Sequence, residues 1–333
     1  MSSSAATAIR PAQPGALERA VRRNGWTIGL YLLLLAFLLF TKLIHESFGA
    51  FDIETLAIGA LPLALAAAAQ TAAVVAGGID LSVGALMALA NVLAASLMLN
   101  QSFGTALGIA ALVLIMGALA GALNGALVVA TKVPDIVVTL AMSFVWGGVA
   151  LLVLPHPGGG APPEFQALAS GRFLTEWVPN ALVVLVLSVG LIWYPLQRTR
   201  LGLSLYAVGS DALAAFRSGV DVARAKIVSY TVCGLFAAAG GLALTMTTGI
   251  GSPLAGTYYT LSGVAAVVLG GVSLAGGRGG MLAPLAAAYI LTIIPTDLLF
   301  LGADPNFGQV IQGAIMVLVV MAAGLISLRR SGA

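Results

Sequence analysis

Long apolar runs separated by short polar stretches occupy almost the whole chain from residue 26 onward. These runs do not alternate with polar residues, as the strands of an outer-membrane barrel do, and crossing the hydrocarbon layer takes about 20 helical residues. We therefore predict about ten transmembrane helices, with eight as the alternative if two runs are re-entrant. The predicted runs are 26–44, 55–76, 83–99, 104–130, 136–154, 178–197, 225–246, 257–274, 281–301 and 308–328.

Composition supports the same class of protein. The chain is 60% hydrophobic and 8% charged, with a mean hydropathy of +1.05, whereas soluble domains carry about 25% charged residues. We predict an all-α polytopic membrane protein with a cytoplasmic tail (1–25), one transmembrane domain (26–328) and a second tail (329–333). No small-residue cleavage site follows the first run, so we expect it to be retained as a helix.

The distribution of Lys and Arg predicts the orientation. If both termini are cytoplasmic, only Lys42 and Arg172 of the 15 basic residues lie at the outer face. Such a bias is typical of proteins of the bacterial inner membrane. The net charge of +3 is therefore interpreted as a signal for orientation in lipid, with no nucleic-acid partner expected.

The chain lacks the common motifs of catalysis and energy conversion. None of its three lysines, Lys42, Lys132 and Lys226, follows a glycine as in a Walker A loop. There is no HExxH motif and no paired-carboxylate motif, and the two histidines stand apart. We expect no enzyme activity, no metal and no cofactor in this chain, so any ATP would be hydrolysed by a partner.

The longest polar stretch between apolar runs is the basic loop 198–226. Within it Asp211 is a good helix N-cap, residues 212–217 favour helix, and Gly219 is suited to ending it. We predict a two-turn helix there. It is either an ordinary connecting segment, made positive by topology, or a rigid docking element for a cytoplasmic partner.

Two features lie inside one apolar run. Gly117, Gly121 and Gly125 are four residues apart, which places them along one helix face and favours close helix packing. Asn124 lies beside this face. Its amide either forms a hydrogen bond between helices or lines a path for a solute.

The stretch "GGIDLSVG" places an acid, Asp80, between apolar runs, where charge is costly. We expect a helix break in which Asp80 and Ser82 cap the third helix, while Gly77 and Gly78 turn the chain and Gly84 permits close packing. Direct contact with a solute and proton carriage by Asp80 remain alternatives.

A second glycine-rich break is expected at Val267 to Gly280, with Gly270 and Gly271 at its start. Its "VVLGGV" echoes "VVAGGI" at Val74 to Ile79. Both would follow helices that run inward, so the echo indicates a parallel repeat.

Four motifs in this order, "GGIDLSVG", "NGALVVATKVPDIVVTL", "AVGSDALAAFRSGV" and "VVLGGVSLAGGRGG", resemble the permeases of ribose-type sugar ABC importers. Autoinducer-2 and rhamnose permeases belong to the same family, and the resemblance runs from about residue 55 to 325. It implies a type II-like importer architecture. It also implies a second permease subunit, identical or related, an extracytoplasmic solute-binding protein, and a cytoplasmic ATPase that binds ATP and Mg.

The resemblance also implies a coupling helix in the basic loop. The residues that match the family pattern there are Gly209, Asp211, Ala214, Ala215 and Gly219. Three acids depart from that pattern, because the family commonly has Asn at Asp211 and often at Asp297, and an apolar or aromatic residue at Asp135.

The leading hypothesis is therefore an ABC importer permease for a monosaccharide or similar polar solute. The alternative is a proton-coupled secondary transporter that uses Asp80 and Asp297 as carriers. Ribose, another pentose or hexose, rhamnose, a polyol and autoinducer-2 all remain open as the solute.

Overall fold

The chain is described by a computed structural model that covers residues 16–302 and 304, then 307, 308, 310, 311, 313, 314, 317, 318 and 321, with side chains from residue 24. Within these residues the fold is entirely helical apart from two isolated β-bridges. The helices are α1 (Ala16–Ile44), α2 (Ala50–Val75), α3 (Val83–Met98), α4 (Phe103–Thr131), α5 (Asp135–Val153), α6 (Pro163–Gln166), α7 (Asn180–Gln197), α8 (Arg200–Ser210), α9 (Ala212–Arg217), α10 (Val222–Thr248), α11 (Thr257–Leu269) and α12 (Leu282–Phe300).

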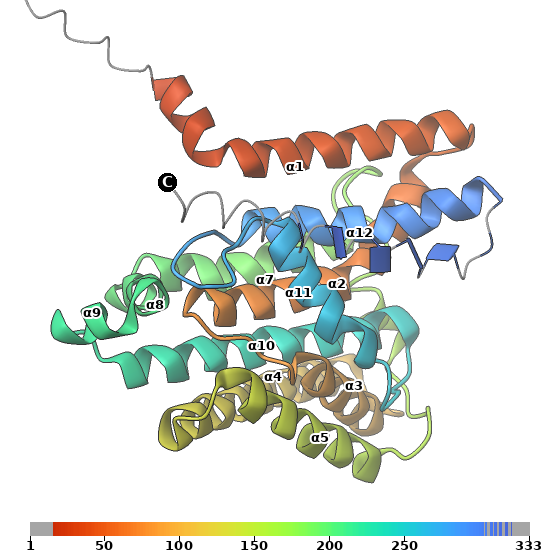
Figure 1. Ribbon diagram of the computed structural model, residues 1–333. Helices are drawn as coiled ribbons and strands as arrows, with labels where there is room; N and C mark the ends of the chain where they lie inside the picture. The colour runs from red at the N-terminus through yellow and green to blue at the C-terminus, as the bar shows by residue number, and fades with distance from the viewer. Residues whose placement is uncertain are drawn as a thin grey trace, which may run out of the picture.

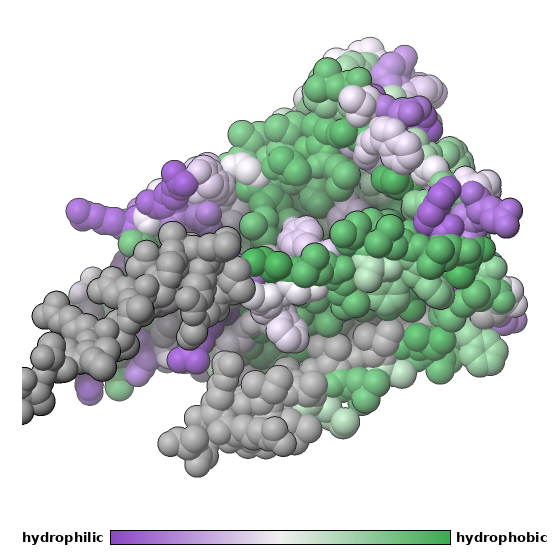
Figure 2. Space-filling view, turned by 90° about the horizontal axis from the view of Figure 1, so that it is seen from above, coloured by the Kyte–Doolittle hydropathy of each residue, from purple (hydrophilic) through white to green (hydrophobic). Residues whose placement is uncertain are grey.

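Two long helices, α2 and α10, form the centre of the bundle. They pack against each other and most of their residues are buried, with α11 and α12 on one side and α3, α4 and α5 on the other (Figure 1). Helix α1 lies at one edge against α12 and is mostly exposed. Figure 2 shows a broad hydrophobic surface with hydrophilic residues gathered toward its two ends. This is the surface expected of a bundle surrounded by lipid.

The structure confirms a polytopic helical membrane protein. Seven of the described helices are long and apolar enough to cross a membrane: α1, α2, α4, α5, α7, α10 and α12. The predicted runs 83–99 and 257–274 correspond to the shorter apolar helices α3 and α11. The tenth predicted run, 308–328, lies largely outside the described residues.

Three details differ from the sequence-based prediction. Helix α11 ends at Leu269, because Gly270 and Gly271 begin a loop. Helix α8 was not predicted, since its 11 residues mix polar and apolar side chains. The segment between the predicted runs 136–154 and 178–197 contains the single-turn helix α6, in which Phe165 is fully buried.

The predicted glycine face of α4 packs against α10. A Cβ atom at Gly121 would collide with the backbone carbonyl of Tyr230, and one at Gly125 would lie 2.9 Å from the Cα of Ile227. Gly234 of α10 faces Gly117 and Gly121 in the same way. Backbones that approach this closely gain van der Waals contact where lipid provides no hydrophobic driving force between helices.

Replacing one glycine of this face should destabilise the bundle. We expect Gly121→Ala to lower the free energy of unfolding by about 1–3 kcal/mol, because the added methyl meets backbone that cannot rotate away. Gly108→Ala on the same helix is the matched control, since nothing lies within 4 Å of its Cβ position. Thermal unfolding of the detergent-solubilised protein measures both. Equal melting temperatures for the two variants would contradict the packing described here.

Candidate functional site

The first predicted helix break lies between α2 and α3. Helix α2 ends in a left-handed turn at Gly77, with φ of +79°, and the N–H of Gly78 donates to the Ala73 carbonyl at 3.1 Å. This is the arrangement that glycine at a helix C-terminus favours. A Cβ at Gly78 would lie 2.5 Å from the hydroxyl oxygen of Tyr230, so the backbone of the break lies directly against a side chain of α10.

Asp80 is fully buried within this break. Its Oδ1 accepts from the backbone N–H of Ser82 at 2.8 Å and from the Ser82 hydroxyl at 2.6 Å. Its Oδ2 lies 3.5 Å from the Sγ of Cys233 on α10. The expected capping contact is thus made at Ser82, the residue just before α3, and not with the N–H groups of the first helical turn. The buried Cys233 thiol is therefore a hydrogen-bond donor to Asp80.

Asn124 extends the Asp80 contacts to two further helices. Its side-chain NH₂ group donates to the Ser82 Oγ at 2.7 Å, and its Oδ1 accepts from the indole N–H of Trp146 on α5 at 3.2 Å. The hydrogen bonds therefore run in one direction, from Trp146 through Asn124 and Ser82 to Asp80. Asn124 is buried and bonds between helices, as one of the two sequence alternatives proposed.

Two side chains that the sequence did not single out bind the backbone of the break. The Gln70 amide on α2 donates to the Asp80 carbonyl at 2.5 Å. The Thr139 hydroxyl on α5 accepts from the Leu81 N–H at 3.1 Å and lies 3.1 Å from the Ile79 carbonyl. Backbone groups freed by a helix break in a membrane protein need such partners. No local sequence pattern indicated which residues would supply them.

The second predicted break begins at the end of α11 and has the same turn as the first. Gly271 has a φ of +72°, and the N–H of Val272 donates to the Val267 carbonyl at 3.2 Å. The turn at Gly77 is therefore equivalent to the turn at Gly271. Aligning "VVAGGI" with "VVLGGV" letter by letter would instead pair Gly77 with Gly270. Gly270 packs instead on α12, where a Cβ would lie 2.5 Å from the Pro284 nitrogen.

The two helices next to the breaks also touch each other. A Cβ at Gly84, in the first turn of α3, would collide with the backbone oxygen of Gly256, just before α11. The Gly84 N–H donates to the hydroxyl of Thr260 on α11 at 3.2 Å. The close packing expected at Gly84 is thus a contact between the beginnings of α3 and α11.

Both breaks meet at the end of α8, in what we call the glycine junction (Gly77, Gly209, Gly276 and Gly277). A Cβ at Gly209 would collide with the Val75 carbonyl and lie 2.6 Å from the Gly277 nitrogen. The Gly277 N–H itself donates to the Val75 carbonyl at 3.0 Å. A Cβ at Gly276 would lie 2.8 Å from the Cα of Gly77. Only backbone atoms fit between these three segments.

Helix α9 directly follows the glycine junction and has the bounds that the sequence predicted. The Asp211 Oδ1 accepts from the N–H groups of Leu213 and Ala214, both at 2.9 Å. The helix ends before Gly219, which has a φ of +84°. Ala215 faces the bundle and Ala214 is exposed, as are the large side chains of Leu213 (58%) and Phe216 (68%).

Asp135 forms a second polar cluster beside the first break. Its carboxylate pairs with the Lys226 Nζ on α10 at 3.1 Å and accepts from the Tyr230 hydroxyl at 3.0 Å. A Cβ at Gly78 would lie 2.6 Å from the Asp135 Oδ2, so the cluster contacts the break. The sequence marked Asp135 only as a departure from a family pattern, because its two partners lie more than 90 residues away.

Asp297 is not part of either cluster. It is buried on α12, with 4% exposed, and its Oδ1 accepts from the Thr41 hydroxyl on α1 at 2.7 Å. The structure therefore brings Gly77, Gly78, Asp80, Ser82 and Asn124 together. It places Asp297 in a separate contact between α1 and α12.

Comparisons with known proteins identify the family of the chain. Residues 52–320 match the family described as the permease component of branched-chain amino acid transport systems. The chain is 34% identical to a fructose import permease of Rhizobium meliloti (91% of this chain, 86% of the relative) and 35% identical to a ribose import permease of Bacillus subtilis (77% and 80%). It is 30% identical to an autoinducer 2 import permease of Yersinia enterocolitica (93% and 94%). No solved structure matches the chain. The chain therefore belongs to this family of permeases, the non-catalytic membrane subunits of ATP-binding-cassette importers.

Proposed function

We propose that this permease moves a monosaccharide, or a similar small polar solute, into the cytoplasm with energy from ATP hydrolysed by a partner subunit. The observation that carries the proposal is α9, a capped helix that exposes Leu213 and Phe216 directly after the glycine junction. A short rigid helix with exposed apolar side chains suits docking to another protein. Its connection to both breaks suits transmission of that partner's movement.

The proposed orientation has ten spans, with both termini and α9 in the cytoplasm of a bacterial cell. Seven of the nine Lys and Arg residues from Lys42 to Arg278 lie at the end of the bundle that carries α9. Lys42 and Arg172 lie at the other end, beside Glu46 and Glu54. This asymmetry supports placing the α9 end inside.

The proposed solute class rests on the relatives and not on a contact in the structure. The family description names branched-chain amino acids, whereas the similar permeases are named for fructose, ribose and autoinducer 2. We therefore propose a sugar or a related polyol-like solute. An extracytoplasmic binding protein would deliver it, and a second permease subunit would complete the pathway.

Proton coupling through Asp80 and Asp297 has weaker support. The side-chain contacts of Asp80 hold the break together through Ser82 and Cys233. Asp297 belongs to a different contact, with Thr41. A proton path needs groups that connect, and the described contacts do not connect these two acids.

Reconstitution tests the proposed function. We expect uptake of one sugar from a panel of ribose, fructose and galactose in proteoliposomes that contain the permease, its ATPase, its binding protein and internal ATP. A protonophore should leave this uptake unchanged while ATP is held constant. Uptake that persists without the ATPase, or that stops when the proton gradient is dissipated, would contradict an ATP-driven importer.

The N-cap of α9 can be tested by charge reversal. Asp211→Arg removes both cap hydrogen bonds, a loss of about 0.5–2 kcal/mol of helix stability. We expect uptake to fall at least several-fold while the protein remains folded. Asp211→Asn keeps the acceptor and is the matched control, with near-normal uptake. Normal ATP-driven uptake by the Arg variant would show that α9 needs no ordered N-terminus.

Asp80 can be tested by separating its charge from its hydrogen bonds. Asp80→Asn keeps an acceptor for Ser82, so we expect uptake to survive. Asp80→Leu leaves the buried N–H and hydroxyl of Ser82 unpaired, at a cost of about 1–3 kcal/mol for each group. We expect that variant to lose uptake and melting temperature together. If Asp80→Asn abolishes uptake at an unchanged melting temperature, Asp80 acts through its charge.

A further inference from the structure

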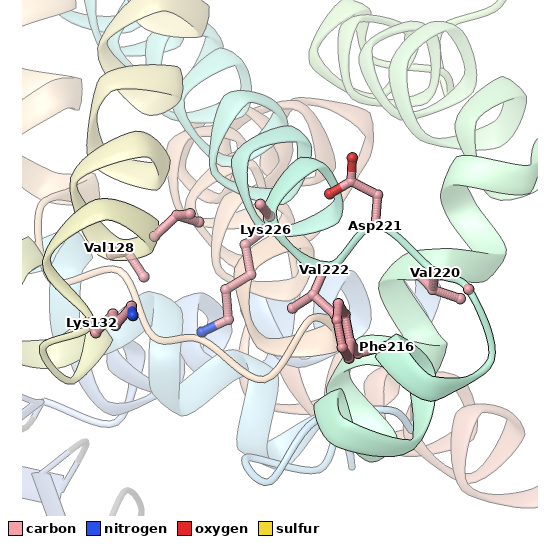
Figure 3. Close-up of a pocket in the computed structure, with 10 residues that line it drawn as sticks. Val128, Lys132, Phe216, Val220, Asp221, Val222 and Lys226 are labelled. Carbon is pink, nitrogen blue, oxygen red and sulfur yellow. The ribbon is translucent and has the colours of Figure 1, made fainter.

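A cavity of about 630 Å³ opens next to α9 (Figure 3). It lies between the end of α4, the segment that joins α9 to α10, and the first turns of α10. The residues that line it are Val128, Val129, Lys132, Phe216, Gly219, Val220, Asp221, Val222, Ala223 and Lys226. Its wall is thus apolar apart from two lysines and one aspartate.

Two lysines, Lys132 and Lys226, and one aspartate, Asp221, are the charged residues that line the cavity. Asp221 caps α10, with its Oδ1 accepting from the Arg224 N–H at 2.9 Å, and Figure 3 shows its carboxylate directed away from Lys226. Lys226 extends across the cavity toward the end of α4, where Lys132 lies. One ammonium, Lys226, is matched by Asp135. Lys132 is exposed and forms no ion pair with a described residue.

The backbone presents Lys132 in an unusual way. Lys132 ends α4 with a φ of +58°, a left-handed conformation that residues with a Cβ seldom adopt. Helix α4 ends at this residue, and the Lys132 side chain lines the cavity there. Lys132 is exposed, whereas only 24% of the Lys226 side chain is exposed, so Lys132 is the more accessible of the two to a negatively charged group.

The cavity is continuous with the proposed docking surface. Phe216 belongs both to its lining and to the exposed face of α9, where 68% of the residue is exposed. A protein that covers Leu213 and Phe216 therefore also covers the cavity mouth.

We propose that this cavity receives an acidic side chain of the partner ATPase, such as a glutamate, because an exposed lysine stands beside its largely apolar wall. Its carboxylate pairs with Lys132 and shares Lys226 with Asp135. This inference rests on the proposed function, because it needs an ATPase docked on α9. It adds a second, electrostatic point of contact to the apolar one.

The test measures binding of the purified ATPase to the permease in nanodiscs made of phosphatidylcholine alone. We expect Lys132→Glu to weaken binding by about tenfold or more, as for reversing one charge of a partly desolvated pair. Lys132→Gln should weaken it less, and raised salt should affect the variant less than the wild type. Arg200→Glu is the matched control, since Arg200 is exposed on α8 outside the cavity. We expect it to bind normally.

Four outcomes separate the possibilities. Rescue of Lys132→Glu by replacing one ATPase glutamate with lysine would establish the pair. Equal affinities of the wild type and Lys132→Glu would overturn the inference while leaving the proposed function intact, whereas a wild type that binds no ATPase would overturn the proposed function itself. If Lys132→Glu changes only the stabilisation by phosphatidylglycerol nanodiscs, the cavity binds a lipid phosphate and the inference is wrong.

Discussion

The structure depends on one constraint, which is that backbone groups freed inside a lipid-embedded bundle must find partners within the protein. Helix α2 stops at Val75, and the chain must reach α3 without exposing unpaired N–H and C=O groups. Gln70, Thr139 and the Asp80 carboxylate supply the partners from three different elements. The break is therefore held from several sides, and α3 can begin part-way through the bundle.

A second consequence concerns the role of buried acids. Asp80, Asp135 and Asp297 are each paired or hydrogen-bonded to a different element of the fold. Their contacts account for Asp80 and Asp135 without a solute, whereas the buried Oδ2 of Asp297 has no hydrogen-bond partner among the described residues. In this permease the costly polar groups chiefly fix how broken helices meet, and the family relationship accounts for the transport function.

The sequence predicted those features of the fold that are set by residues close together in the chain. The bounds of α9 were predicted correctly, because an N-cap at Asp211 and a left-handed glycine at 219 are set by neighbouring residues. The glycine face of α4 followed from a spacing of four residues. The partners of Asp135, and Thr139 at the first break, were missed because they are contributed by residues far away in the chain. Gln70 is only ten residues from Asp80, but no local pattern indicated its contact. The short helix α8 was missed because its polar and apolar residues match no membrane pattern.

The glycine junction has a mechanical consequence. Where side chains separate two segments, a small displacement of one can be absorbed by rotation about χ angles. Here Gly209 meets the Val75 carbonyl and the Gly277 nitrogen with nothing between them. The end of α8 therefore cannot shift without moving the backbone at both breaks. A displacement of α9 would therefore be passed to the segments that lead into α3 and α12, with little of it absorbed by side chains. Even an alanine at Gly209 would hold the three segments apart, because its Cβ would collide with the Val75 carbonyl.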